Sequence, residues 1–272
     1  MAGRLADAPA RPAHGSAHRV KVGRVRLDQL LVERGLAPTR SKAQALLMAG
    51  RVRVGEGDGA RLDRKPGDLV VASVPLDVVE AMPYVSRGGE KLAAALDAFG
   101  VDPSGRVCLD VGASTGGFTD VLLRRGASRV YALDVGRGQL AESLRSDPRV
   151  VSLERTHVRR LDPAEPDAVT LPERPSLAVV DVSFISLTRV LSPVLAALDA
   201  PADVVALVKP QFEAGPREAP KGVVRDPGVR RAAVERVRAH AASLGFEVRG
   251  EIESPLTGPA GNREFLLHLV RP

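Results

Sequence analysis

The sequence predicts an α/β protein in which a mainly parallel sheet, covered by helices on both faces, follows a small α+β domain. From residue 84 onward, short apolar runs alternate with amphipathic stretches, which is typical of repeated strand–helix units. Among them, residues 112–117 form a glycine-rich loop that follows an apolar run and opens an amphipathic stretch. Glycines let the backbone approach a ligand closely, and the helix start offers unpaired N–H groups. We therefore expect this loop to bind a ligand.

The composition fits a globular protein with an aliphatic core. The chain has 272 residues, of which 44% are hydrophobic and only 3% are aromatic, and Trp is absent. Its single cysteine, Cys108, lies in a predicted buried strand, so we expect neither a disulfide within the chain nor a metal site. The 39 basic residues comprise 33 Arg and 6 Lys. Because this chain uses Arg for most of its positive charges, a position that has Lys suggests a need for a titratable amine, which Arg cannot supply.

Charge and hydropathy bear on partners and location. A net charge of +6 favours a polyanionic partner. The sequence has no run of about 20 apolar residues, so we expect no membrane span and a cytoplasmic protein. Residues 1–23 are rich in Ala, Arg, Pro and His and lack a continuous apolar segment. This composition favours a disordered tail over a transit peptide.

The first domain, residues 24–82, is predicted from leucines at helical spacing followed by alternating charged and apolar residues. Its expected elements are helices over 26–35 and 41–48, strands over 51–54 and 69–73, and a linker over 74–83. Basic residues gather around the helix pair and the first strand. The residues expected to bind RNA are Arg26, Arg40, Lys42, Arg51 and Arg53, together with Arg87 at the start of the next domain.

The helix–helix–strand pattern resembles an S4-like RNA-binding domain. The resemblance rests on three segments: Leu-Asp-Gln-Leu-Leu-Val-Glu-Arg-Gly, Ser-Lys-Ala-Gln-Ala-Leu-Leu and Gly-Arg-Val-Arg-Val. The alternative is a solvated charged face on a small α+β unit with no RNA ligand.

The second domain, residues 83–272, is predicted to begin with a helix that Ser86 caps and Gly100 ends. The expected strands are 106–111, 129–134, 150–153, 177–182, 203–208, 246–254 and 264–270. The expected helices are 117–125, 139–145, 187–198 and 227–244. Because only a turn separates the last two strands, we expect them to pair antiparallel in a seven-stranded sheet.

The glycine loop is followed by a carboxylate at the position where a nucleotide-binding fold needs one. Asp134 closes the second strand, 22 residues after Gly112, and can accept ribose hydroxyls. Ser114 stands where the dinucleotide fingerprint has glycine, which argues against a nicotinamide dehydrogenase. The loop resembles that of S-adenosylmethionine methyltransferases, whose sheet is Rossmann-like; an ordinary strand–turn–helix is the alternative. The residues expected to contact S-adenosylmethionine are Asp110, Gly112, Ala113, Ser114, Gly116, Gly117, Phe118, Asp134 and His157.

Four ionisable residues stand at the ends of predicted elements. Lys91 lies on the first helix of the domain, Asp181 and Lys209 end apolar strands, and Glu264 begins the last strand. Ligands of open α/β sheets bind outside the carboxyl ends of the parallel strands. We therefore expect these residues to share one site beside the glycine loop, although each alone is more typical of a structural ion pair.

Five motifs resemble the TlyA family of bacterial rRNA ribose 2′-O-methyltransferases, whose members carry an S4-like domain ahead of an FtsJ-like domain and were earlier named haemolysins. They are Ser-Arg-Gly-Gly-Glu-Lys-Leu, Leu-Asp-Val-Gly-Ala-Ser-Thr-Gly-Gly-Phe-Thr-Asp, Ala-Leu-Asp-Val-Gly-Arg-Gly-Gln-Leu, Val-Asp-Val-Ser-Phe-Ile-Ser-Leu and Val-Lys-Pro-Gln-Phe-Glu. The resemblance implies a catalytic tetrad of Lys91, Asp181, Lys209 and Glu264. It also implies, as substrate, a cytidine in small-subunit rRNA, large-subunit rRNA or both. His157 stands where the family suggests Asn near the adenine pocket.

The chemistry suits these residue types. A ribose hydroxyl is a weak nucleophile, and a positioned amine can accept its proton during attack on a sulfonium methyl. Lys209 is the candidate for this amine. In-line placement of the hydroxyl and the methyl group supplies the remaining catalysis, without a metal.

Three other functions remain open from sequence. S4-like domains also precede pseudouridine synthases, and Arg61-Leu-Asp63 is similar to their catalytic segment, although it lies inside the small domain. A non-catalytic rRNA-binding protein would explain the first domain alone. A pore-forming haemolysin is disfavoured because no segment is apolar enough to span a bilayer.

Overall fold

The computed structural model describes residues 23–272, except 49, 58–59, 63, 80–82, 216 and 259. The chain divides into two compact units between residues 81 and 82, here called the N-terminal unit and the C-terminal unit. The predicted tail lies outside the described residues, apart from Gly23, and so does Asp63 of the segment similar to a pseudouridine synthase.

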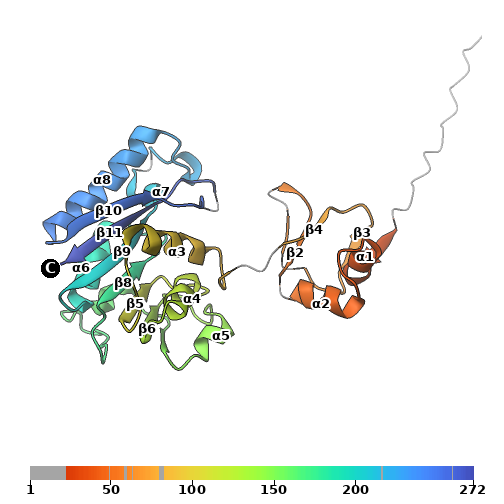
Figure 1. Cartoon of the computed structure of the whole chain (residues 1–272). Coiled ribbons are helices and arrows are strands. Elements are labelled where there is room, and N and C mark those ends of the chain that lie inside the picture. Colours follow the sequence, from red (N-terminus) through yellow and green to blue (C-terminus); the bar gives the residue numbers. More distant parts are fainter. Residues whose placement is uncertain are drawn as a thin grey trace, which may run out of the picture. The chain divides into compact units, whose positions relative to one another are not determined.

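The N-terminal unit packs two helices against two short antiparallel strand pairs (Figure 1). Its elements are β1 (Arg24–Arg26), α1 (Leu27–Glu33), α2 (Arg40–Met48), β2 (Val52–Val54), β3 (Leu69–Val71) and β4 (Leu76–Val78). In α1, Leu27, Leu30 and Leu31 are buried, as a helix with apolar residues three and four apart predicts. They pack with Val52 and Val54, the inward residues of an alternating strand.

Two features of this unit differ from the sequence prediction. Residues 74–83 are not all linker, because β4 pairs with β2, with Val52 opposite Val78. The extra strand β1 pairs with β3. Both strands are three residues long, too short to leave a clear alternating pattern, and only their pairing defines them.

The C-terminal unit is built on one seven-stranded sheet (Figure 1). Its strands are β5 (Val107–Val111), β6 (Arg129–Leu133), β7 (Val150–Leu153), β8 (Leu177–Val180), β9 (Ala202–Val208), β10 (Glu247–Glu253) and β11 (Phe265–Arg271). The order across the sheet is β10-β11-β9-β8-β5-β6-β7. Strands β5 to β9 pair in parallel, whereas β11 is antiparallel to both β9 and β10. The predicted sheet, with its antiparallel last strand, is therefore confirmed.

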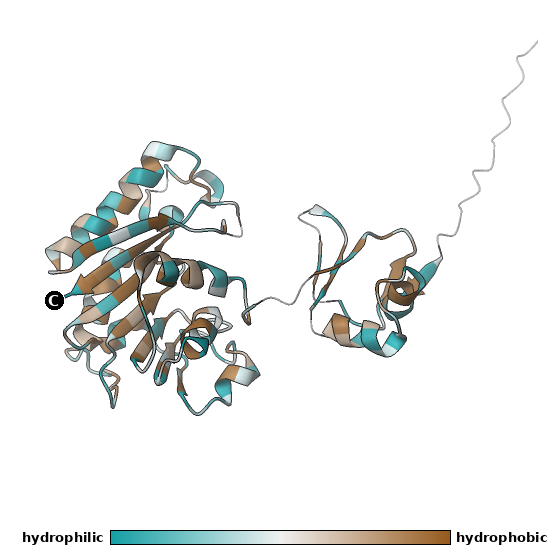
Figure 2. Cartoon of the chain, in the orientation of Figure 1, coloured by the Kyte–Doolittle hydropathy of each residue, from teal (hydrophilic) through white to brown (hydrophobic). Residues whose placement is uncertain are grey.

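Helices cover both faces of this sheet. They are α3 (Gly88–Phe99), α4 (Gly117–Arg124), α5 (Glu142–Arg145), α6 (Leu191–Ala197), α7 (Pro210–Glu213) and α8 (Pro227–Ser243). Buried residues of α3, α4 and α5 form one core with the sheet, and those of α6 and α8 form the other. Figure 2 shows the strands mostly in hydrophobic colours, as expected of strands buried on both faces.

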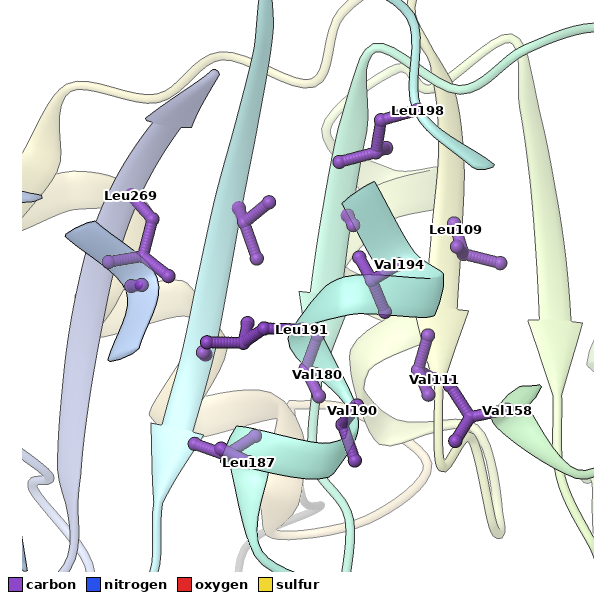
Figure 3. Close-up of a cluster of buried hydrophobic side chains, with 14 of the residues drawn as sticks. Leu109, Val111, Val158, Val180, Leu187, Val190, Leu191, Val194, Leu198 and Leu269 are labelled. Carbon is purple, nitrogen blue, oxygen red and sulfur yellow. The ribbon is translucent and has the colours of Figure 1, made fainter. Parts of the chain in front are cut away.

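The core under α6 shows how the strand period divides residues between the two faces. Leu109 and Val111 of β5 point toward α6, where Leu191 and Val194 pack near them (Figure 3). Cys108, one position away, belongs to the opposite core.

Four local predictions are corrected. The helix expected over 187–198 is a 3₁₀ turn, Leu187–Arg189, followed by α6, because Pro193 is tolerated only in the first turn of a helix. Helix α5 is shorter than its predicted range, and α7 was not predicted. Ser86 does not cap α3 through its side chain; Arg87 occupies the N-cap position, and the Ser86 carbonyl accepts from Gly89 N.

Candidate active site

A cavity of about 320 Å³ opens at the carboxyl edge of the sheet in the C-terminal unit. This volume lies at the lower end of the range for small-molecule sites. The glycine loop, the start of α3 and the loops after β8, β9 and β10 contribute to its wall. It is lined by Ser86, Arg87, Gly88, Lys91, Gly112, Ala113, Ser114, Thr115, Gly117, Phe118, Asp181, Ser183, Lys209, Leu256, Thr257 and Glu264.

The glycine loop is shaped by close backbone contacts. Gly112 has φ of 88°, a left-handed conformation that favours glycine, and a Cβ there would collide with the carbonyl of Asp181. A Cβ on Gly117 would strike the Ser86 hydroxyl. These two glycines therefore let the ends of β5 and β8 and the start of α3 converge on the cavity.

Asp134 follows β6 and holds the loop from the other side. One carboxylate oxygen accepts from Ser114 N at 2.8 Å, and the other accepts from Gly136 N at 2.7 Å. A carboxylate has about four acceptor positions, so roughly two remain for ligand hydroxyls. Asp134 also lines a small hollow next to the loop, together with Gln139 and Glu154. This arrangement suits the ribose of a nucleoside.

The four predicted catalytic residues meet at the cavity as two ion pairs. Lys91 Nζ lies 2.5 Å from Glu264 Oε2, with 11% and 1% of the two side chains exposed. Lys209 Nζ lies 2.6 Å from Asp181 Oδ1 and donates to Ser183 Oγ at 2.9 Å. Buried ion pairs are costly to desolvate, so two of them on one cavity point to a functional site.

Sheet topology explains why these residues converge. Asp181 follows β8, Lys209 follows β9, and Glu264 immediately precedes β11, whose first residue pairs with the last residue of β9. Because β11 runs antiparallel, its start lies at the same edge as the strand ends. Lys91 reaches this edge from the first turn of α3.

Asp110 lies beneath the cavity and is not among the residues that line it. It is fully buried, and Oδ2 accepts from Thr119 Oγ1 at 2.7 Å, while Oδ1 has no partner. Burial raises its pKa to about 7, the Thr119 hydrogen bond opposes this rise, and the charges of Asp181 and Asp134 add to it. Asp110 therefore supports the loop from below.

The other predicted cofactor and RNA residues lie in several places. Phe118 lines the cavity, as expected of a cofactor residue, and so does Arg87, which was predicted to bind RNA. His157 is exposed and lies outside the cavity and the hollow; its Nδ1 accepts from Arg159 N at 3.2 Å, which caps the 3₁₀ turn Val158–Leu161.

In the N-terminal unit, the predicted RNA-binding residues fall into two groups. Arg26 and Arg40 both pair with Asp28, and Arg51 donates to the carbonyl of Val79 at 3.3 Å. The remaining two, Lys42 and Arg53, are exposed, and their side chains have no hydrogen bond or ion pair to a described residue.

Two site residues were missed by the sequence analysis. Phe184 is 90% exposed with φ of 66°, and its ring centroid lies 5.2 Å from that of Phe212. Glu213 is buried and accepts from Ser186 Oγ at 2.5 Å and Leu187 N at 2.7 Å, so it ties α7 to the loop after β8. Burial raises the pKa of Glu213 against these two hydrogen bonds. Both residues lie in motifs that carry the family resemblance, Val-Asp-Val-Ser-Phe-Ile-Ser-Leu and Val-Lys-Pro-Gln-Phe-Glu, and those motifs were the signal that could have found them.

Comparison with known families agrees with this geometry. Residues 84–271 match the FtsJ-like methyltransferase family, and residues 25–56 match the S4 domain. The fold, the glycine loop and the acid after β6 define an S-adenosylmethionine-dependent methyltransferase, which sets aside the dehydrogenase and pseudouridine synthase alternatives.

Several relatives share both units. The 16S/23S rRNA (cytidine-2′-O)-methyltransferase TlyA of Mycobacterium tuberculosis is 48% identical over 90% of this chain and 90% of its own. Hemolysin A of Brachyspira hyodysenteriae is 39% identical over 90% of this chain and 100% of its own. A solved structure from Streptococcus thermophilus, also named a hemolysin, is 44% identical, with a TM-score of 0.68, covering 92% of this chain and 89% of that one.

The chain therefore belongs to the TlyA family of FtsJ-like methyltransferases with an S4 domain. Within the described residues, no helix has the length and apolar character needed to cross a membrane.

Proposed function

We propose that this enzyme methylates the ribose 2′-hydroxyl of cytidine in ribosomal RNA, of the small subunit, the large subunit or both, in the cytoplasm. The observation that carries the proposal is the pair of lysine–carboxylate contacts on one cavity beside the glycine loop. The name of the relative that is 48% identical supports the same substrate.

The residues present suit S-adenosylmethionine. Gly112 and Gly117 leave room for close backbone approach, and the free acceptor positions of Asp134 suit ribose hydroxyls. Ser114 and Phe118 complete the wall on this side. When bound, this cofactor supplies an electrophilic methyl group on a positively charged sulfur.

Lys209 is the proposed proton acceptor. The ammonium of the ion pair would first lose a proton to solvent; the amine would then take the proton of the 2′-hydroxyl as the oxygen attacks, and the re-formed ammonium would be held by Asp181 at 2.6 Å and Ser183 at 2.9 Å. Lys91 and Glu264 line the same cavity, with Glu264 next to Lys209 at the paired ends of β11 and β9, and they are proposed to fix the position of the ribose by hydrogen bonds.

Phe184 is suited to hold the target base. Its ring is 90% exposed, and its φ of 66° is a strained conformation for a residue other than glycine, of a kind that often occurs at functional sites. It lies one residue after Ser183 of the cavity, and unpaired bases stack well on such rings. The proposed substrate is therefore a nucleotide turned out of its helix.

The N-terminal unit is proposed to bind the ribosomal subunit without taking part in the chemistry. Lys42 and Arg53 are among its exposed cations without a described partner, and they suit RNA phosphates.

The test is to incubate the protein with labelled S-adenosylmethionine and rRNA from cells that lack the gene, then map the label by mass spectrometry of nucleosides. We expect 2′-O-methylcytidine at a defined rRNA position. Label on a base, or no transfer by an enzyme that binds S-adenosylmethionine, would contradict the proposal.

A further inference from the structure

The segment 214–226, between α7 and α8, carries three cations that the active site does not use. Arg217, Lys221 and Arg225 are exposed, and their side chains form no hydrogen bond or ion pair with any described residue. Most arginines elsewhere in the C-terminal unit pair with carboxylates or carbonyl oxygens. Three unpaired cations on one short segment suggest a polyanionic ligand.

The two carboxylates of the segment are engaged by the backbone. Glu218 accepts from Gly215 N at 2.8 Å. Asp226 accepts from Gly228 N at 2.6 Å and caps α8 at its positive end. Neither pairs with a cation of the segment, so the three basic side chains are available to an external anion.

A buried side chain fixes this segment beside the catalytic edge. Asn262 is 2% exposed; its Oδ1 accepts from Val224 N at 2.9 Å, and its Nδ2 donates to Gly222 O at 2.8 Å. Asn262 lies two residues before Glu264, and its own carbonyl accepts from Gly258 N in the loop that lines the cavity. The amide therefore links the basic segment to the strand that carries a catalytic residue.

Lys221 itself sits in a conformation that needs such support. Its φ of 56° is left-handed, a conformation that is strained for a residue other than glycine. The side chain of Asn262 bonds to Gly222 and Val224, which follow Lys221 in the chain, and these bonds hold the turn in place. Strain of this kind persists where the surroundings impose it, often at a functional site.

We propose that segment 214–226 binds the phosphates that flank the target nucleotide, with Arg217, Lys221 and Arg225 as contacts and Asn262 as the positioning residue. The inference rests on the proposed function, since a ribose in the cavity brings its neighbouring phosphates to this edge. It assigns RNA binding to the C-terminal unit itself, in addition to the N-terminal unit.

The experiment compares methyl transfer to an rRNA fragment by wild type, by the triple variant Arg217→Ala, Lys221→Ala, Arg225→Ala, and by a control, Arg249→Ala. Arg249 is an exposed arginine on the edge strand β10; it pairs with Glu247 and does not line the cavity. The triple variant should raise KM for RNA and lower the salt slope of RNA binding by roughly 2, from about 0.7 per lost phosphate contact. Its kcat at saturating RNA and its affinity for S-adenosylmethionine should not change.

Asn262→Ala keeps all three cations but releases the segment, and it should also raise KM for RNA. The conservative Asn262→Gln should restore part of the loss. A triple variant with the KM and salt slope of wild type would overturn the inference. If the wild-type protein itself transferred no methyl to rRNA, the proposed function would be refuted. The wild-type measurement alone shows this, so the two failures can be told apart.

Discussion

Each unit contains a buried carboxylate that pairs with basic side chains. The two units differ in whether the basic partner is exposed or buried as well. In the N-terminal unit, Asp28 is fully buried while Arg26 and Arg40 are 43% and 56% exposed. At the cavity, both members of each pair are largely buried: Lys91 with Glu264, and Lys209 with Asp181.

We propose that this difference separates a structural cluster from a catalytic one. Asp28 accepts from Arg26, Arg40 and Gln44. Its pKa is held well below the ordinary value, chiefly by the Arg26 hydrogen bond, with Gln44 and Arg40 adding to this against the effect of burial. No cavity adjoins Asp28 among those found in the described residues. The lysine pairs instead face a space that a substrate can enter.

The largest effect on stability is expected when one partner of the buried cavity pair is removed. Glu264→Gln leaves the Lys91 ammonium buried without a counter-charge, which should lower the free energy of unfolding by about 3–5 kcal/mol. Urea unfolding of the full chain measures this. The double variant Lys91→Met, Glu264→Gln should recover much of the loss; a double variant as unstable as the single one would contradict the explanation.

Asp110, a buried carboxyl with no cationic partner, should make the protein less stable as pH rises. The pKa of Asp110 is raised from 3.8 to about 7, mainly by burial, so the folded state keeps a proton that the unfolded state releases. Wild-type stability should therefore fall, relative to Asp110→Asn, as pH rises from about 4 to about 7. Each unit of pKa difference corresponds to about 1.4 kcal/mol. Parallel stability curves for the two proteins across this range would disprove the raised pKa.

Asp28→Asn should have a smaller effect, because Arg26 and Arg40 can turn to water. We expect a loss of about 1–3 kcal/mol at pH 7, from weakened hydrogen bonds to a buried group. Because its pKa is lowered in the folded state, the contribution of Asp28 is present above its ordinary pKa of 3.8 and is lost as pH falls below it. Since the folded-state pKa lies well below 3.8, this loss is only partial at pH 3, and hydrogen exchange of amides in residues 24–54 should distinguish the variant from wild type clearly at pH 7 and somewhat less at pH 3.

Asp134, the proposed ribose-binding carboxylate, should affect cofactor binding with no large change in stability. Asp134→Ala should weaken S-adenosylmethionine binding by about 1–3 kcal/mol, through loss of charge-assisted hydrogen bonds. Calorimetric titration measures the change. An unchanged affinity would remove Asp134 from the cofactor site.

The sequence was sufficient to predict the sheet and the convergence of the predicted catalytic residues. Asp181, Lys209 and Glu264 each adjoin a strongly apolar strand, and strand direction alone places them at one edge. The pairing of Arg26 and Arg40 with Asp28 could not be predicted, because it depends on how α1 and α2 pack. Nor could the burial of Asp110, because it depends on how α4 packs Thr119 against the end of β5.

The most direct test of a catalytic role for the cavity pair is single-turnover methyl transfer by Lys209→Arg. Arginine keeps the positive charge beside Asp181 but cannot accept a proton. We expect the rate to fall on the order of 10²–10⁴-fold, while binding of S-adenosylmethionine and RNA persists. A rate close to that of wild type would mean that Lys209 acts only as a charge, as Arg26 and Arg40 do around Asp28, and that another group accepts the proton.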